Sequence, residues 1–377
     1  SWAYDCGSKR PTQVKAMVHR FAGELSSVAS DADPIKLLAI SHFDDDHVHG
    51  VEALLQERRV EHLALPYMPL RQSLFNATGR AGGAMSSTTA AFQFDPPAWL
   101  LARGLGERVD QIVLVRGGSD AADGDSQVMF PEPPLPDRGV RAEEGAAANF
   151  RLLNSEPDGP AIHLQSHSNS VKLVNQLPLE FVFFNSTLPN EVAPSSGLSL
   201  DVVRAALQKL LQGLGINSGG RLPTRVWRPA LRSFYDRHFG ATGPARNNIS
   251  LCMMIRPQSR SWNFFPCSSE AGCVPASRQT LLLTGDLAMS SSEISAMKSH
   301  FGPRWDELAV VQVPHHGSKH SWVKGNAASI GPVAFVQCIP DTCRLGRHPH
   351  ASVSADLSAH PVFAADYQRG VIQQFMV

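Results

Sequence analysis

A run of metal-binding side chains at residues 41–50 limits what this chain can fold into more than any other feature of its sequence. The run reads Ser-His-Phe-Asp-Asp-Asp-His-Val-His-Gly and follows a largely apolar stretch at residues 36–40. Carboxylates and imidazoles crowded in this way oppose folding, because like charges repel and buried polar groups lose their water. Bound divalent metals make the same crowding favourable. The run therefore predicts a metal-dependent hydrolase.

The overall charge excludes a chain that binds nucleic acid with its whole surface. The 377 residues include 34 basic and 34 acidic side chains, so any basic surface must be local. The sequence has neither a long apolar stretch nor a secretory signal, so we expect no membrane span and a cytoplasmic location. The six cysteines are too sparse for a disulfide framework and are expected to be free thiols. Loop clips or a soft metal site remain open for Cys267 with Cys273 and for Cys338 with Cys343.

Hydrophobic spacing predicts an α/β order in the first 75 residues. The expected elements are a strand ending in a turn at 2–8, a helix at 11–29, a buried strand at 36–41, a helix from 50 and a short strand at 62–65. The helix at 11–29 would turn Val14, Met17, Val18, Phe21 and Leu25 to one face. This order puts the metal-binding run at the C-terminal end of a strand, where α/β sheets present functional side chains.

The same pattern returns after residue 249. The expected elements are strands at 250–255, 279–284, 308–313 and 333–337, a helix from Ser290 to about His300, and a closing helix and hairpin. Ser290 and Glu293 have the spacing of a capping box at the start of that helix. Asp286 follows the second strand and His315-His316 follow the third. Together with residues 42–47, three strand ends therefore carry residues that can bind metal.

Residues 76–244 are expected to be an insertion. Its stretch at 117–160 is rich in Gly, Pro, Asp, Glu and Ala and predicts a long or disordered loop. Short strands are expected at 161–185 and an amphipathic helix at 198–214. The insertion ends in an arginine-rich stretch, residues 221–246, in which Trp227, Phe234 and Tyr235 are interleaved. That mixture suits a nucleic-acid backbone and unpaired bases, although a solvated helix face over core aromatics explains it equally well.

Four motifs resemble those of a known superfamily. They are Asp5-Cys6-Gly7, His42-x-Asp44-x-Asp46-His47, Thr284-Gly285-Asp286 and Val313-Pro314-His315-His316-Gly317-Ser318. Together they resemble the metallo-β-lactamase fold superfamily and, more narrowly, the soluble metallohydrolase domain of ComEC-type DNA-uptake competence proteins. Asp44 stands at the second ligand place, where the superfamily usually has His and the competence branch has Asp. The resemblance covers about residues 1–75 and 245–377, which form the expected hydrolase domain.

The resemblance implies an αββα sandwich that holds two divalent metal ions, zinc or manganese. His42 with Asp44 would hold one metal, Asp46 with His47 would hold the other, and Asp286 would bridge them. His316 is the favoured further ligand, and His315 would then contact the substrate phosphate or the leaving group. Many members of the superfamily have another His where this chain has Asn247-Asn248. The metal site of His42 and Asp44 is therefore expected to bind its metal more weakly, to hold manganese, or to be filled only with substrate.

The implied activity is that of a nuclease acting on DNA or RNA. Two metals acidify a bound water, which supplies the nucleophile. The expected catalytic residues are Asp46, His315 and His348, and either histidine could protonate the leaving group. The expected substrate contacts are Asn247, Asn248, Ser318, Arg228 and Arg232. His49 is expected to be structural or solvent-facing, and Asp45 to be an exposed loop residue.

Two other interpretations stay open, because the superfamily fold hosts many chemistries. The first is a hydrolase of a small phosphoester, lactone or thioester, for which the insertion would serve as a pocket lid. The second is a non-catalytic binding module whose metals are structural. The oligomeric state is not predicted.

Overall fold

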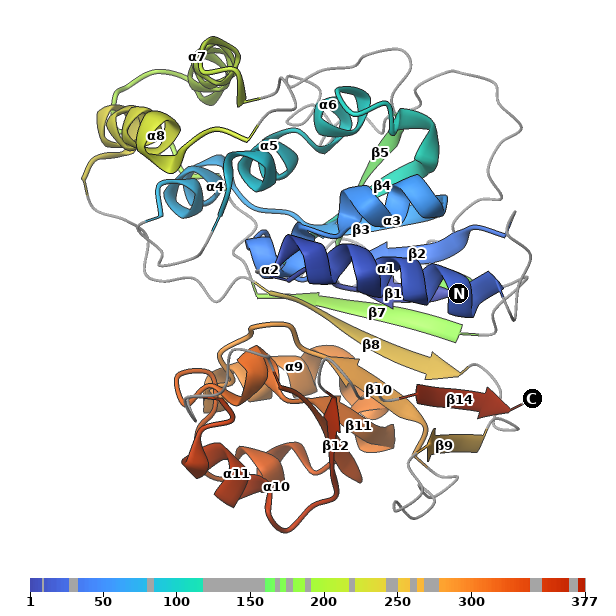
Figure 1. Cartoon of the computed structure of the whole chain (residues 1–377). Helices are drawn as coiled ribbons and strands as arrows, with labels where there is room; N and C mark the ends of the chain where they lie inside the picture. Colours follow the sequence, from blue (N-terminus) through green and yellow to red (C-terminus); the bar gives the residue numbers. More distant parts are fainter. Residues whose placement is uncertain are drawn as a thin grey trace. The chain divides into compact units, whose positions relative to one another are not determined.

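The computed structural model shows an α/β protein whose described residues form two compact units (Figure 1). Unit one contains Ser1–Gly117 and Thr187–Asn247, with part of the segment between them. Unit two contains Ser166–Ser186 and Asn248–Val377. The structure describes residues 1–8, 10–26, 33–79, 85–117, 160–166, 170–173, 179–186, 191–216, 221–241, 250–257, 263–267, 278–339, 348–365 and 372–376. The expected loop at 117–160 falls almost wholly outside these ranges, and so do Asn247 and Asn248.

Unit one is built on a five-stranded sheet in which the first four strands run parallel, in sequence order. The strands are β1 (Trp2–Tyr4), β2 (Ile35–Ala39), β3 (Val60–Pro66), β4 (Val109–Arg116) and β5 (Ala161–Ser166). Leu38 pairs with Ala3 on one side and with Leu63 on the other. Continuous apolar runs such as 37–40 are typical of parallel strands buried on both faces. The α/β order expected for the first 75 residues is thus confirmed, and β4 extends this sheet into the range expected to be an insertion.

Unit one contains eight described α-helices and a short 3-10 helix. They are α1 (Pro11–Ser26), α2 (Asp45–Val48), α3 (Val51–Glu57), α4 (Leu70–Ala77), α5 (Ser87–Phe94), α6 (Pro96–Leu101), η1 (Gly106–Arg108), α7 (Leu200–Gly213) and α8 (Thr224–Phe239). Helices α1 to α6 and η1 lie between strands β1 and β4 in the sequence. Helix α1 buries Val14 and Val18, as predicted, but Met17 is 42% exposed. The inward stripe continues through Ala22 instead, because Val18 and Ala22 lie four residues apart on one helix face.

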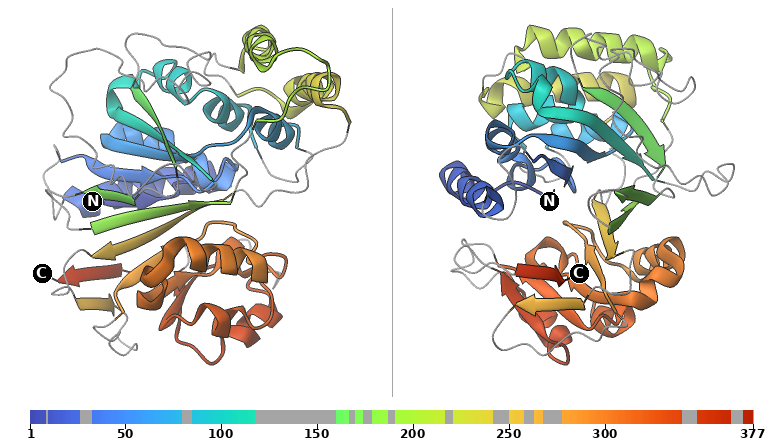
Figure 2. Two further views of the ribbon diagram at one scale, coloured as in Figure 1. Left: turned by 180° about the vertical axis from the view of Figure 1, so that it is seen from behind. Right: turned by 90° about the vertical axis from the view of Figure 1, so that its right-hand side faces the viewer.

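The amphipathic helix expected at 198–214 is confirmed as α7. It buries Val203, Leu207 and Leu211, and Ser199 caps it by accepting a hydrogen bond from the Val202 N–H. The arginine-rich stretch is helical as well, and α8 lies beside α4 in both views of Figure 2. Its aromatic residues Trp227 and Tyr235 are fully buried. They are core residues and offer no surface on which bases could stack.

Unit two is built on a seven-stranded mixed sheet in the order β13-β12-β11-β10-β8-β7-β6. Strands β10 to β13 run parallel, whereas β6, β7, β8 and β10 pair antiparallel. The strands are β6 (Ser170–Leu173), β7 (Leu179–Asn185), β8 (Leu251–Pro257), β10 (Thr280–Leu283), β11 (Leu308–Gln312), β12 (Ala334–Cys338) and β13 (Val362–Ala365). The strands predicted from residue 250 to residue 337 are confirmed within a few residues.

The closing hairpin predicted for the chain is wrong. Strand β13 pairs parallel with β12, and β14 (Ile372–Met376) pairs antiparallel with β9 (Asn263–Cys267) in a separate two-stranded sheet. Helix α11 (Ala351–Leu357) lies between β12 and β13 in the sequence. A helix between two strands makes a crossover, so the second strand returns parallel to the first.

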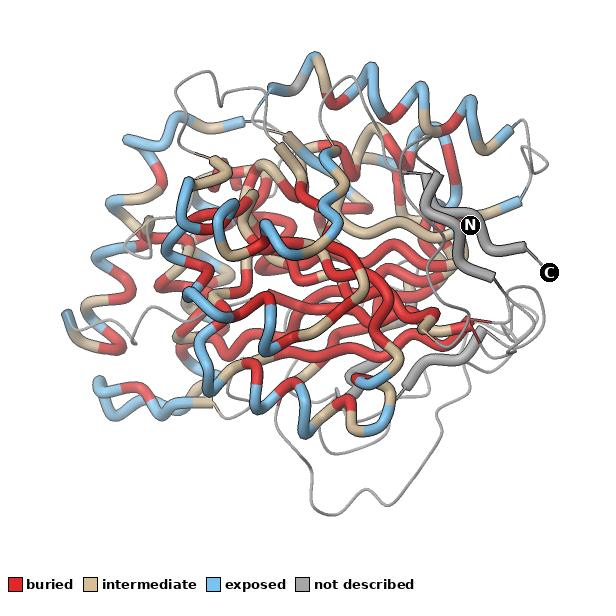
Figure 3. The backbone as a smooth tube through the Cα atoms, turned by 90° about the horizontal axis from the view of Figure 1, so that it is seen from below, coloured by how far each residue is buried: buried red, intermediate tan, exposed pale blue. Residues whose placement is uncertain are grey.

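Helices α9 (Ser291–Phe301), α10 (Asn326–Ile330) and α11 share one core with the sheet of unit two. Its fully buried members include Met254, Leu282, Met297 and Phe335. Figure 3 shows the strands as buried and the helices as striped between buried and exposed positions. Ser290 caps α9 by accepting from the Glu293 N–H, which confirms the predicted start of this helix.

Two further expectations concern the thiols and the membrane. Cys6, Cys252 and Cys338, whose side chains the structure describes, are free thiols, as predicted. Among the described helices, none combines the length and the apolar character that crossing a bilayer requires.

Candidate metal centre

The metal-binding run in unit one folds as a loop and one short helix at the C-terminal end of β2. The strand ends at Ala39, and the chain turns into α2 at Asp45. The turn brings the rings of His42 and His47 to a centroid distance of 4.0 Å. His42 Nε2 lies 3.8 Å from the Asp44 carboxylate. Two imidazoles and a carboxylate therefore converge on one end of a parallel sheet.

Asp5 fixes the position of this loop. Its carboxylate accepts hydrogen bonds from the Ser41 backbone N–H at 2.7 Å and from the Ser41 hydroxyl at 2.8 Å. The same carboxylate lies 2.8 Å from His47 Nδ1. A carboxylate on Nδ1 selects the tautomer whose Nε2 carries the lone pair that a metal needs. Asp5 itself has φ of 55°, an uncommon conformation for a non-glycine residue and one that often occurs at functional sites.

The segment after Asp5 packs directly against the loop. The Cys6 N–H donates to the His47 carbonyl at 2.9 Å, and the Gly50 N–H donates to the Cys6 carbonyl at 2.7 Å. A Cβ added at Gly7 would lie 2.6 Å from the Asp46 carbonyl group. Only glycine allows the two backbone segments to approach this closely.

The prediction that Asp45 is exposed is wrong. Asp45 is 9% exposed and accepts hydrogen bonds from the Ser86 N–H at 2.8 Å and the Thr89 hydroxyl at 2.7 Å. His49 Nε2 lies 3.2 Å from the same carboxylate. Burial alone would raise the pKa of Asp45, but the hydrogen bonds from His49, Thr89 and Ser86 outweigh it and lower the pKa to about 2. Asp45 therefore ties α2 to the start of α5 as an ionised carboxylate.

His49 has a structural role, which is one of the two roles expected for it. Its hydrogen bond to Asp45 raises its pKa against the opposing effect of burial. Its Nδ1 lies 3.3 Å from the Ser8 carbonyl oxygen. The ring thus links α2 to the N-terminal segment of the chain.

In unit two, Asp286 follows β10 in a turn whose backbone N–H groups donate to side-chain oxygens. The Asp286 N–H donates to the Ser250 hydroxyl at 3.1 Å. The Gln312 side-chain oxygen accepts from the Thr284 N–H at 2.9 Å and the Gly285 N–H at 3.2 Å. These bonds fix the direction in which the Asp286 side chain leaves the sheet.

His315 and His316 follow β11 and both have left-handed backbone, with φ of 47° and 54°. Such strain in two consecutive non-glycine residues is costly and typical of functional turns. His315 Nδ1 lies 3.5 Å from the Asp286 carboxylate, and its ring stacks on that of His348 at a centroid distance of 6.1 Å. His316 Nδ1 lies 3.2 Å from the Cys338 carbonyl oxygen, the arrangement usual for a metal-binding histidine.

The remaining predicted residues are placed as follows. Asp46 is half-buried in α2. Ser318 is buried, and its hydroxyl accepts from the His320 N–H at 3.3 Å. Arg228 and Arg232, on α8 of unit one, donate to the carbonyls of Met85 at 2.8 Å and Thr78 at 2.9 Å.

The sequence did not predict two of these contacts. Asp5 belongs to one of the four motifs, but its distance along the chain from residues 41–50 gives no hint that it bonds His47. Asp45 was expected to be an exposed loop residue. No local signal in the sequence indicates its burial, because its partners Ser86 and Thr89 lie 41 and 44 residues further along the chain.

The donor set in unit one fits a divalent transition metal. Imidazole nitrogens with carboxylate oxygens suit zinc or manganese, and the carboxylate behind His47 is the usual second partner of such a ligand. No protein-family model matches the chain, and no curated protein is similar to it in sequence.

Proposed function

We propose that this protein is a metal-dependent phosphodiesterase with the αββα fold of the metallo-β-lactamase type. The observation that carries the proposal is the Asp5–His47 pair beside His42, at the C-terminal end of a parallel strand. A half-buried carboxylate that orients one of two neighbouring imidazoles serves a bound cation better than it serves packing alone. The fold proposal is supported by two sheets that each carry their own helices.

The side chains have separate roles in this proposal. His42, Asp44, Asp46 and His47 are the proposed metal ligands of unit one, and Asp286 and His316 are those of unit two. The metals, when bound, supply an acidified water and stabilise negative charge on phosphoryl oxygens. His315 would act as the general acid that protonates the leaving oxygen. Its Nδ1 lies near both Asp286 and the Ser321 hydroxyl.

A small phosphoester is a second candidate substrate, and one observation favours it over nucleic acid. Trp227 and Tyr235 are fully buried, so α8 presents arginines without the aromatic surface that unpaired bases use. Phosphate recognition by arginine is common to both substrates. Assays with substrates of different size therefore distinguish nucleic acid from a small phosphoester.

Cleavage assays with metal-free protein to which Mn²⁺ or Zn²⁺ is added back test the proposal. The substrates are labelled single- and double-stranded DNA, RNA and a chromogenic phosphodiester. A lactone and a thioester are tested separately as alternative substrates. We expect phosphodiester cleavage that depends on added metal. Cleavage of the lactone or thioester alone would contradict the proposal.

The matched variants are Asp46→Asn and His47→Ala, with His19→Ala as control. His19 is 82% exposed at its side chain and pairs only loosely with Glu57 at 3.6 Å. We expect a loss of at least about 100-fold in kcat/KM for both ligand variants and none for the control. Urea unfolding of each variant separates lost catalysis from lost folding, and equal cleavage by Asp46→Asn would refute the proposal.

A further inference from the structure

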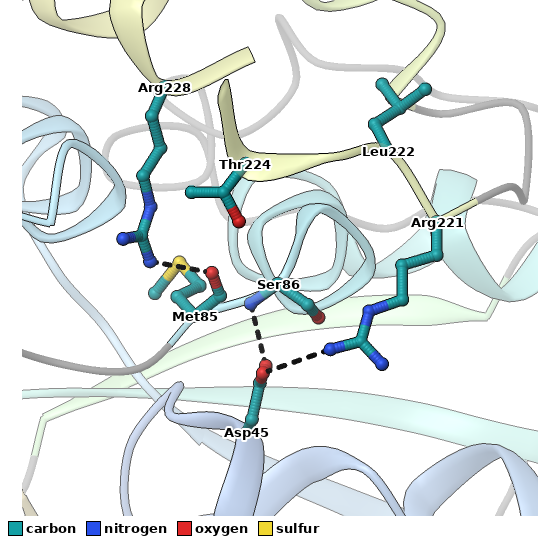
Figure 4. Close-up of a pocket in the computed structure, with 7 residues that line it drawn as sticks. All are labelled: Asp45, Met85, Ser86, Arg221, Leu222, Thr224 and Arg228. Carbon is teal, nitrogen blue, oxygen red and sulfur yellow. Dashed lines mark hydrogen bonds and ion pairs between the residues drawn. The ribbon is translucent and has the colours of Figure 1, made fainter. Parts of the chain in front are cut away.

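A small polar cavity lies next to the metal-binding loop, entirely within unit one (Figure 4). Its volume is about 220 Å³. Its polar lining comes from α2, from the start of α5 and from the segment that leads into α8: Asp45, Ser86, Arg221, Thr224 and Arg228. Three segments that are distant in the sequence therefore combine two arginines, two hydroxyls and one carboxylate.

Arg228 brings donors that the protein does not fully use. One terminal nitrogen donates to the Met85 carbonyl at 2.8 Å, whereas its buried Nε has no hydrogen-bond partner among the described residues. Burial and the neighbouring Arg232 lower the pKa of Arg228, and Asp45 and Asp44 oppose them by raising it. A guanidinium keeps its charge under such shifts. An unpaired buried donor on a charged group is costly, and an anion bound by the same guanidinium would offset part of that cost.

Arg221 stands at the mouth of the same cavity. Its guanidinium lies 3.9 Å from the Asp45 carboxylate, a loose ion pair in which 61% of the arginine side chain stays exposed. The adjacent Leu222 N–H donates to the Ser87 hydroxyl at 2.7 Å, which anchors the backbone beside Arg221. Figure 4 shows the Arg221 guanidinium directed toward Asp45 and the Arg228 guanidinium directed toward the Met85 carbonyl.

The charges of the lining favour an anion. Two arginines outnumber one aspartate, so the lining carries a net charge of about +1. Asp45 is already committed to donors from Ser86, Thr89 and His49. Its remaining role toward the cavity is to hold Arg221 near the wall, so that it opposes an incoming anion less than a free carboxylate would.

We propose that this cavity binds one phosphoryl group of the substrate. One of its lining residues, Asp45, lies in the sequence between the proposed metal ligands Asp44 and Asp46. Guanidinium groups match phosphoryl oxygens in charge and geometry, and the Ser86 and Thr224 hydroxyls add hydrogen-bonding groups. The cavity is smaller than the roughly 300–1,000 Å³ of pockets that enclose drug-sized ligands. It therefore suits a phosphoryl group and not a whole nucleotide. This role in catalysis rests on the proposed function, but the binding itself needs neither metal nor turnover.

The test is calorimetric titration of the full chain after metal removal. Inorganic phosphate is the first probe, and a thymidine dinucleotide, which carries one phosphodiester, is the second. Tighter binding of phosphate would assign the cavity to a terminal phosphate, and tighter binding of the dinucleotide to an internal diester. Either result supports binding of a phosphoryl group. If the wild type binds neither phosphate nor the dinucleotide, the proposal is overturned.

The variants are Arg221→Gln and Arg228→Gln, with Arg20→Gln as the matched control. Arg20 belongs to the same unit, is 60% exposed at its side chain and pairs with one carboxylate, Glu24. We expect each cavity variant to weaken binding about tenfold, since a hydrogen bond to a charged group is lost, and the control to bind as the wild type does. Equal binding by all three would overturn the proposal.

Two features keep the outcome clear. Arg228 also supports the Met85 carbonyl, so its variant is checked by urea unfolding, whereas the exposed Arg221 gives a variant that folds normally. Because the titration is done without metal, phosphate binding can succeed when the cleavage assays fail, and the reverse. The two proposals therefore fail separately.

Discussion

At the scale of single residues, Asp5 has the clearest testable role. Its carboxylate bonds His47 Nδ1 at 2.8 Å and both polar groups of Ser41. An Asp5→Asn change keeps the size of the side chain but removes the charge behind His47. We expect metal affinity to fall about 10–100-fold, the usual cost of losing such a partner. Competition with a chromophoric chelator measures it, with the exposed Asp201→Asn as control, and unchanged affinity would deny Asp5 this role.

Gly7 is the second residue whose substitution has a defined expected result. An alanine Cβ there would lie 2.6 Å from backbone atoms of Asp46 and His47, which cannot move aside as a side chain can. We expect Gly7→Ala to lower the free energy of unfolding by about 1–3 kcal/mol, the usual cost of overpacking. The control is Gly23→Ala in α1, where an added Cβ meets no atom within 4 Å.

The control in α1 is expected to move stability in the opposite direction. Alanine in a helix interior is favoured over glycine by about 0.5–1 kcal/mol. Urea unfolding of both variants measures the two effects on one scale. If Gly7→Ala were as stable as Gly23→Ala, the close packing of the N-terminal segment on the metal-binding loop would be excluded.

At the scale of elements, α9 carries a buried histidine that makes unit two sensitive to acid. His300 Nε2 lies 2.7 Å from the Phe183 carbonyl oxygen at the end of the helix. Burial lowers its pKa from 6.5 to about 4, the Phe183 carbonyl opposes this shift, and Arg304 adds to it. The folded pKa lies below the unfolded one, so the unfolded state binds the proton first as pH falls. Stability is therefore complete above about pH 6.5 and is lost between there and about pH 4.

The expected size of this effect is about 3 kcal/mol between pH 7 and pH 4, because the pKa of His300 is about 4 in the folded state and 6.5 in the unfolded state. A His300→Gln variant keeps a hydrogen-bond donor but does not titrate in this range. Urea unfolding at pH 4, 5, 6 and 7 measures the difference in slope between variant and wild type. Identical slopes would mean that His300 does not contribute to acid sensitivity.

Elements were predictable from the sequence where one local pattern decides them. The strands β2 and β11 have continuous apolar runs, and α7 and α9 have helical spacing and a capping residue. Asp45 was not predictable, because its burial depends on donors from Ser86 and Thr89 that lie about 41 and 44 residues away in the sequence. The aromatics of α8 illustrate the same limit. Arginine and aromatic spacing alone does not say which face of a helix the core covers.

At the scale of the whole molecule, the sequence predicted which candidate ligands follow a strand better than it predicted the limits of the units. The run at 41–50, Asp286 and His315-His316 each follow a strand, as expected, because apolar runs that end in polar clusters are local signals. Strand β4 and the pairing of β14 with β9 were missed. Both depend on contacts between segments that are far apart in the sequence, which no local pattern records.

The proposed metal ligands of each unit give the last prediction. A metal bound by the native state stabilises whatever part of the chain supplies its ligands, by about 2.7 kcal/mol at 100 times its Kd. Peptides from residues 36–57 of unit one and 280–318 of unit two report on the two ligand groups separately in hydrogen exchange. We expect added Zn²⁺ or Mn²⁺ to slow exchange in both, because the proposal assigns metal ligands to each unit.

Two variants make this prediction specific. Asp286→Asn should abolish the metal-dependent protection of residues 280–318, whereas the exposed Asp306→Asn should leave it unchanged. Protection confined to residues 36–57 in the wild type would mean that unit one binds the metal alone. The phosphodiesterase proposal would then lose Asp286 and His316, while the phosphoryl cavity, which lies wholly within unit one, would stand.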